Sequence, residues 1–82
     1  MSEKKLVNLR QMPSGRVGKV VEIQGGMGLV HRLSTLGVRP SKKITKISSM
    51  LMRGPVTIQV DNTRLAIGFG MAGRIIVELD EA

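Results

Sequence analysis

Cysteine, tryptophan and tyrosine are all absent from this 82-residue chain. Without cysteine the chain has neither a disulfide framework nor a thiolate metal site. The only aromatic residue is Phe69, so the interior must be built from valine, isoleucine, leucine and the six methionines. Methionine fills irregular gaps in small cores, and it also serves at surfaces that adapt to a partner. The composition leaves both roles open.

Long apolar runs are also missing. No uninterrupted apolar stretch reaches about 18 residues, so we expect no insertion into a membrane. Residues 1–10 lack the apolar segment of a secretory signal peptide, which favours a cytoplasmic location. We expect a single domain over residues 1–82, with its core from about residue 6 to residue 79, because this length suffices for one hydrophobic core.

The residue types that bind metals or perform catalysis are sparse. His31 is the only histidine, and half of the six acidic residues (Glu78, Asp80 and Glu81) lie near the C-terminus. Zinc and iron sites draw three or four ligands from histidine, cysteine and carboxylates, which this pattern does not supply. No nucleophile stands in a recognisable elbow motif. We therefore expect no enzyme activity, no catalytic residues, no metal site and no cofactor.

Basic residues outnumber acidic ones by thirteen to six, which gives a formal net charge of +7. Such an excess suits nucleic acid, an anionic membrane surface or an acidic protein partner. A basic barrel that binds nucleic acid would contact phosphates through Lys42, Lys43, Lys46 and the strand arginines. Because one phenylalanine offers little surface for base stacking, nucleic acid is the weaker alternative.

Glycine and proline divide the chain into short segments that are typical of a β-rich domain. The expected strands cover residues 16–24, 44–52, 56–60, 64–68 and 75–79. In the first of these, Val17, Val21 and Ile23 share one face with imperfect alternation, as in a strand that bends. The second strand does not keep a period of two, which predicts a bulge. Asp61-Asn62 fits the positive-φ positions of a tight hairpin turn.

One helix is expected over residues 27–36, after the first long strand. Leu29, Leu33 and Leu36 follow the spacing i, i+4 and i+7 that buries one face of a helix. Gly37 stands where a left-handed residue ends a helix, and Pro40 prevents its continuation. About five strands and one short helix predict a mostly β fold, a small and strongly bent antiparallel barrel.

Two glycine-rich segments are interpreted as turns. Residues 68–73 match a dinucleotide-binding pattern, but a strand is expected after them instead of the helix that binding requires. Residues 25–28 join a strand to the helix and lack the lysine and hydroxyl residue that end a phosphate-binding loop.

The order of several segments resembles the FeoA family over about residues 6–77. The most specific stretch is Arg32-Leu33-Ser34-Thr35-Leu36-Gly37-Val38-Arg39-Pro40. Further matching segments are Gly18-Lys19-Val20, Ile23-Gln24-Gly25-Gly26, Gly54-Pro55-Val56, Leu65-Ala66-Ile67-Gly68, Met71-Ala72 and Ile75 to Val77. The chain has Ser41 where the family usually has glycine, and Phe69 where it often has arginine.

The resemblance implies an SH3-like barrel and a small cytoplasmic accessory protein of bacterial ferrous-iron transport. It further implies a non-catalytic protein–protein adaptor that binds the cytosolic region of a FeoB-type transporter. A related domain ends the metal-dependent repressors of the diphtheria-toxin type, whose DNA-binding and dimerisation domains this sequence lacks, so we expect no such repressor here. The alternative is a basic small barrel that binds nucleic acid, since residues 15–20 resemble the start of a KOW motif.

We expect contact with the partner at two places, the helix and the end of the second strand, while the oligomeric state stays open. The expected contact residues are Met27, Val30, His31, Ser34, Met50, Met52 and Arg53.

Overall fold

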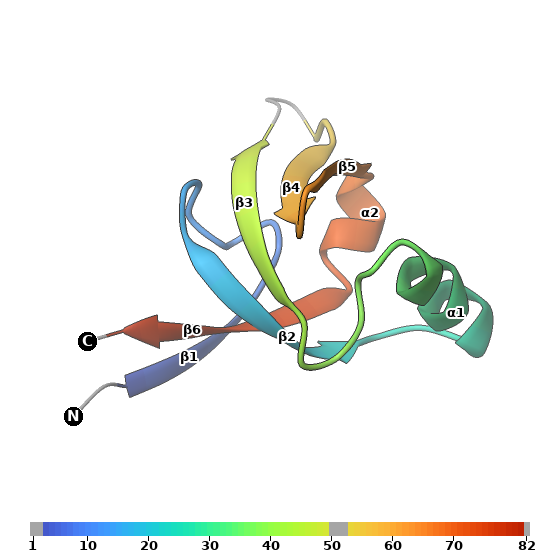
Figure 1. The fold of residues 1–82 in the computed structure, drawn as a ribbon, viewed down its shortest axis with the longest axis horizontal. Helices are drawn as coiled ribbons and strands as arrows, with labels where there is room; N and C mark the ends of the chain where they lie inside the picture. The colour runs from blue at the N-terminus through green and yellow to red at the C-terminus, as the bar shows by residue number, and fades with distance from the viewer. Residues whose placement is uncertain (1–2, 50–52, 82) are drawn as a thin grey trace.

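The computed structural model describes residues 3–49 and 53–81 of the chain. In order, its elements are β1 (Glu3–Asn8), β2 (Val17–Ile23), α1 (Met27–Thr35), β3 (Lys43–Ser49), β4 (Val56–Val60), β5 (Thr63–Ile67), α2 (Phe69–Ala72) and β6 (Ile75–Glu81) (Figure 1). No helix among the described residues is both long enough and apolar enough to cross a membrane.

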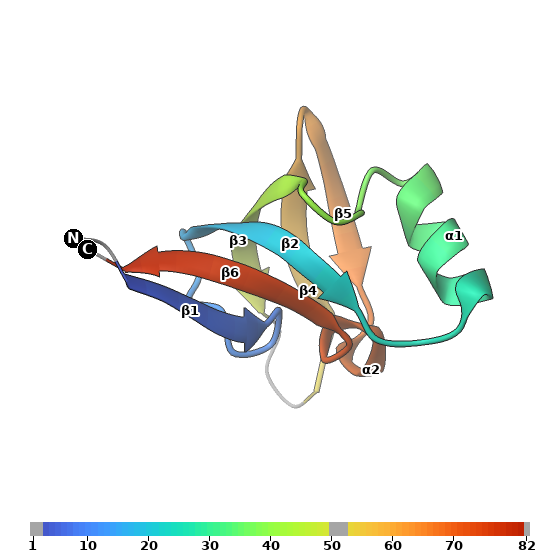
Figure 2. The ribbon, with the colours of Figure 1, turned by 90° about the horizontal axis from the view of Figure 1, so that it is seen from below.

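The strands form one antiparallel sheet in the order β1-β6-β2-β3-β4-β5. β1, β6 and β2 lie side by side, while β3, β4 and β5 cross them, so the sheet folds over on itself (Figure 2). Within the described ranges, β1 and β5 are its two free edges and do not pair with each other. The expected mostly β, barrel-like fold is confirmed, with six strands instead of about five and without closure.

β1 is the strand that the sequence-based expectation omitted. It pairs with β6 along its whole length, from Glu3 opposite Glu81 to Asn8 opposite Ile76. Leu6 points outward while Val7 is buried, so the apolar residues of β1 do not alternate in the way that identifies a strand. Its conformation depends on pairing with a segment at the other end of the chain.

The expectation that Val17, Val21 and Ile23 share one face of β2 is wrong. Val17 is exposed and Val20 is fully buried, whereas Val21 and Ile23 are only half-buried. The register with β6 shifts between Val20 and Glu22, so the strand carries a bulge there. Because a bulge adds one residue to one strand, the side chains on either side of it change face.

The predicted bulge of β3 is confirmed, since its register with β4 shifts between Lys46 and Ser48. The strand ends at Ser49, and the remaining residues of the expected strand, 50–52, lie outside the described residues. The β4–β5 hairpin is also as expected, with alternating burial along β4 and Val60 paired with Thr63. Asp61 has a φ of 55°, whereas Asn62 does not share its positive φ.

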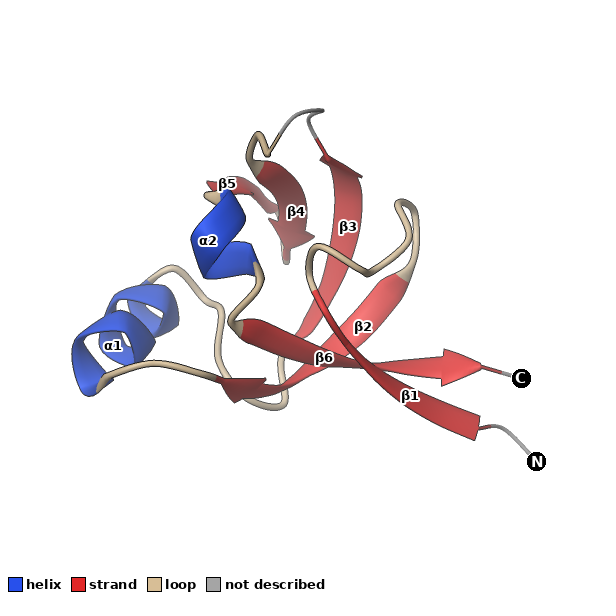
Figure 3. Ribbon diagram, turned by 180° about the vertical axis from the view of Figure 1, so that it is seen from behind, coloured by secondary structure: helices blue, strands red, loops and turns tan. Residues whose placement is uncertain are grey.

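The core fills the space that the folded sheet encloses, and α1 and α2 lie at its end. α2 makes the corner between β5 and β6, where the sequence predicted a turn (Figure 3). The buried apolar residues are Val7, Leu9, Met12, Val20, Leu33, Val38, Ile44, Val56, Ile58, Val60, Ile67, Ala72, Ile75, Val77 and Leu79.

α1 projects from one end of the sheet in every view (Figures 1, 2 and 3). Its predicted end is confirmed: Gly37 has a φ of 95° and its N–H donates to the carbonyl of Ser34 at 3.0 Å. The N–H of Val38 donates to the carbonyl of Leu33 at 2.9 Å, which completes a Schellman motif. Leu33 is fully buried, but Leu36 is exposed because it is the C-cap, beyond the last helical turn.

Candidate docking surface

α1 has a second face that does not enter the core. Met27, Val30, His31 and Ser34 follow the spacing i, i+3, i+4 and i+7, which places their side chains on one side of a helix. Together with Gly25 they line a hollow of about 310 Å³. We call these four helical residues the α1 outer face. The structure thus brings together the four helical residues that the sequence selected.

Met27 dominates this face. It is 89% exposed, so this methionine is not one of those that fill the core. Val30 and Ser34 are half-buried and His31 is exposed. Complete burial of a methionine side chain on a partner would contribute about 1.5–3 kcal/mol, and its flexible thioether adapts to the shape of that partner.

Both ends of α1 are fixed, so the outer face is held in place before any partner arrives. At the N-terminus the N–H groups of Leu29 and Val30 donate to the carbonyl of Gly26, at 3.1 and 3.2 Å. Gly25 packs closely beneath the helix, because a Cβ there would lie 2.7 Å from Cδ2 of Leu29. The Schellman motif fixes the C-terminus. A preorganised surface loses less conformational entropy when it binds.

In the second part of the expected contact region, the structure describes Arg53 alone. Met50 and Met52 lie outside the described residues. Arg53 is exposed, has a φ of 66° and does not line the hollow at α1. Its guanidinium carbon instead lies 5.9 Å from the centroid of the Phe69 ring on α2.

Arg10 also lies over this ring, a contact that no pattern in the sequence indicated. The guanidinium carbon of Arg10 is 4.1 Å from the Phe69 centroid, within the range of a cation–π interaction. The guanidinium also rests against Gly73, where a Cβ would collide with it. The corner at α2 is therefore basic, although Phe69 stands where the family often has arginine.

The lysine cluster that nucleic acid binding would require is not assembled on the surface. Lys46 is only 3% exposed, and its Nζ donates to the carbonyl oxygens of Arg10 at 3.1 Å and Met12 at 2.5 Å. Burial lowers the pKa of Lys46 below its ordinary value of 10.5. Lys42 forms an ion pair with Asp61 at 2.8 Å, which leaves Lys43 as the exposed member without a carboxylate partner among the described side chains.

Metal-binding residue types do not gather in the described part of the chain. Within residues 3–49 and 53–81, no group of three or more histidine, cysteine, aspartate or glutamate residues could hold a metal ion. His31 is an exposed polar residue of the α1 outer face.

The sequence profile of the FeoA domain matches residues 7–79. The chain belongs to the FeoA family. A relative from Methanocaldococcus jannaschii, named Fe(2+) transport protein A, is 36% identical over 59 residues, which cover 72% of this chain and 70% of that protein. The family assignment made from the ordered motifs is thus confirmed, and the family is associated with ferrous-iron transport.

Solved structures support the same assignment. The crystal structure of an iron uptake regulatory protein, FeoA, has a TM-score of 0.81 and 39% identity, and covers 92% of this chain and 99% of that one. The solution structure of FeoA from Chlorobium tepidum has a TM-score of 0.80 at 18% identity, covering 89% and 70%. A manganese-dependent transcriptional repressor has a TM-score of 0.82 at 15% identity, covering 94% of this chain and 43% of the repressor. The last two show the fold alone, and the SH3-like FeoA fold is confirmed.

Proposed function

We propose that this FeoA-family protein is a non-catalytic cytoplasmic adaptor that docks on the cytosolic region of a FeoB-type ferrous-iron transporter through the α1 outer face. The observation that carries the proposal is Met27, which is 89% exposed on a helix whose opposite side is anchored in the core by Leu33. The relative from M. jannaschii and the FeoA crystal structure, named for Fe(2+) transport and iron uptake, support the cellular process.

The hollow beside Met27 suits an apolar side chain of the partner. Its apolar wall comes from Met27 and Val30, while His31 and Ser34 offer hydrogen-bonding groups that would fix the orientation of the partner. The net charge of +7 would accelerate encounter with an acidic surface. The α1 outer face would thus contribute most of the binding free energy, and the net positive charge would raise the association rate constant.

The test is a binding measurement between the purified protein and the FeoB-type transporter of the same organism, solubilised in mild detergent. Met27→Ala should raise the dissociation constant by about tenfold or more, because a central exposed anchor contributes far more than its neighbours. Leu36→Ala is the matched control, since Leu36 is an exposed apolar residue at the end of the same helix and does not line the hollow.

The two ways of failing have different meanings. If wild-type protein does not bind the transporter, the adaptor function is wrong. If it binds and Met27→Ala binds equally well, another surface makes the contact. Thermal unfolding of each variant, monitored by circular dichroism, checks that the fold is kept.

A further inference from the structure

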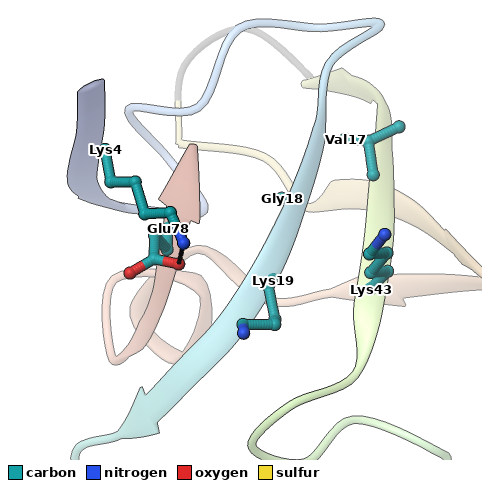
Figure 4. Close-up of a pocket in the computed structure, with 6 residues that line it drawn as sticks. All are labelled: Lys4, Val17, Gly18, Lys19, Lys43 and Glu78. Atoms are coloured by element: carbon teal, nitrogen blue, oxygen red, sulfur yellow. Dashed lines mark ion pairs between the residues drawn. The ribbon is translucent and has the colours of Figure 1, made fainter. Parts of the chain in front are cut away.

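A second hollow lies on the outer side of the sheet, formed by side chains from β1, β2, β3 and β6. It measures about 380 Å³ and shares no residue with the hollow at α1. Its lining residues are Lys4, Val17, Gly18, Lys19, Lys43 and Glu78 (Figure 4). The function proposed above does not use this surface.

Strand register places like charges opposite each other in this hollow. Lys19 on β2 lies directly opposite Lys43 on β3, and like charges in this position destabilise a sheet. On its other side Lys19 lies opposite Glu78 of β6. Glu78 forms its ion pair with Lys4, at 3.5 Å (Figure 4).

The hollow is therefore left with uncompensated positive charge. Among the side chains that the structure describes, neither Lys19 nor Lys43 has an ion-pair partner. Three lysines against one glutamate give a formal excess of two positive charges in one small concavity. An arrangement that weakens the folded protein and lacks an internal counter-ion is well suited to an anionic ligand.

Exposed aliphatic side chains flank these charges. Val17 lines the hollow and is 52% exposed. Leu6, on the edge strand β1, is 61% exposed and lies opposite Glu78 of β6. We call the set of Lys4, Leu6, Val17, Lys19, Lys43 and Glu78 the lysine face.

We propose that the lysine face is a second docking site, which takes an acidic protein segment whose carboxylates stand next to aliphatic side chains. The carboxylates would neutralise Lys19 and Lys43, while the aliphatic groups would cover Val17 and Leu6. Glu78 within the hollow opposes a continuous phosphate backbone, and the one aromatic residue, Phe69, is not there to stack bases. A concave site also fits a peptide better than a flat lipid surface.

The test uses the full-length protein and the labelled octapeptide Glu-Asp-Leu-Leu-Glu-Asp-Leu-Leu as the probe, with binding followed by fluorescence anisotropy. The double variant Lys19→Gln with Lys43→Gln should weaken binding by about tenfold, since two charge contacts are lost. The control is Lys5→Gln with Arg64→Gln, which removes two charges from exposed residues outside the lysine face. This control should change the affinity by less than about twofold.

Three results would overturn the proposal. Equal weakening in both double variants would show attraction by net charge alone. Tighter binding of octathymidylate than of the peptide at Lys19 and Lys43 would make the site one for nucleic acid, and tighter binding there of vesicles of phosphatidylcholine and phosphatidylserine would make it a lipid site. Met27→Ala should keep the affinity for the peptide, so the outcome is independent of docking through α1.

Discussion

Lys43 and Lys46 belong to the same strand, β3, and have opposite surroundings. Lys43 points outward, is exposed and faces another lysine, Lys19. Lys46 points inward and is 3% exposed, with its ammonium group hydrogen-bonded to two backbone carbonyl oxygens. Strand geometry therefore decides which of the two lysines is buried, because successive side chains point to opposite faces of a sheet. The buried lysine then needs hydrogen-bond acceptors for its ammonium group.

α1 shows the same contrast with apolar residues. Leu33 is fully buried, whereas Met27 on the opposite side of the helix is almost fully exposed. The inner side of the molecule therefore determines stability, and the outer side carries surfaces that other molecules can reach. Substitutions of matched residues on the two sides can test this division.

The largest effect is expected for Leu33→Ala. Removing this buried side chain should lower the free energy of unfolding by about 2–5 kcal/mol, because the transfer energy is lost and a cavity remains. Met27→Ala, the matched change on the outer face, should alter it by less than about 0.5 kcal/mol. Urea denaturation measures both, and a loss well under 2 kcal/mol for Leu33→Ala would contradict the packing of α1 on the core.

An intermediate effect is expected for Lys46→Met. At pH 7 it should lower the free energy of unfolding by about 1–3 kcal/mol, because the carbonyl oxygens of Arg10 and Met12 lose their donor. Lys43→Met, which removes the same charge from the outer side, should change it by less than about 0.5 kcal/mol.

The free energy of unfolding of the wild type should also depend on pH, because the folded and unfolded chains bind protons differently at Lys46. Because burial lowers the pKa of folded Lys46 below 10.5, the unfolded chain binds more protons between the lowered value and 10.5. The stability of the wild type relative to Lys46→Met should therefore rise as the pH increases through this interval, and fall as it decreases. Urea denaturation of both proteins at several pH values up to 10.5 provides the measurement, and a constant difference would contradict the desolvated state of Lys46.

The smallest effect is expected for Lys43→Glu, which replaces a repulsive pair with an attractive one. The new carboxylate would face Lys19 and should raise the free energy of unfolding by about 0.2–1 kcal/mol. Salt should reduce this gain, because exposed charges are screened. Arg64→Glu is the control, since Arg64 faces the neutral Gln59. Equal gains in both variants would show that only the net charge matters.

Local patterns in the sequence determined much of the fold. The alternation of Val56, Ile58 and Val60 identified β4, since a strand that buries one face repeats every two residues. Gly37 marked the end of α1, because few other residues accept its positive φ. Met27, Val30, His31 and Ser34 were selected from the sequence as helical contact residues, and the structure places all four on one side of α1.

Other features were decided only when distant segments met. β1 became a strand through its pairing with β6, and the bulge in β2 placed Ile23 against the core while Val17 stayed exposed. The contact between Arg10 and Phe69, the burial of Lys46 and the opposition of Lys19 and Lys43 all depend on register between strands or on packing across the fold. Register is set by the sum of many long-range contacts, and a one-residue change in it moves every side chain to the other face. For that reason the sequence alone identified the family and the four helical residues expected to contact a partner, while the lysine face depends on the folded sheet.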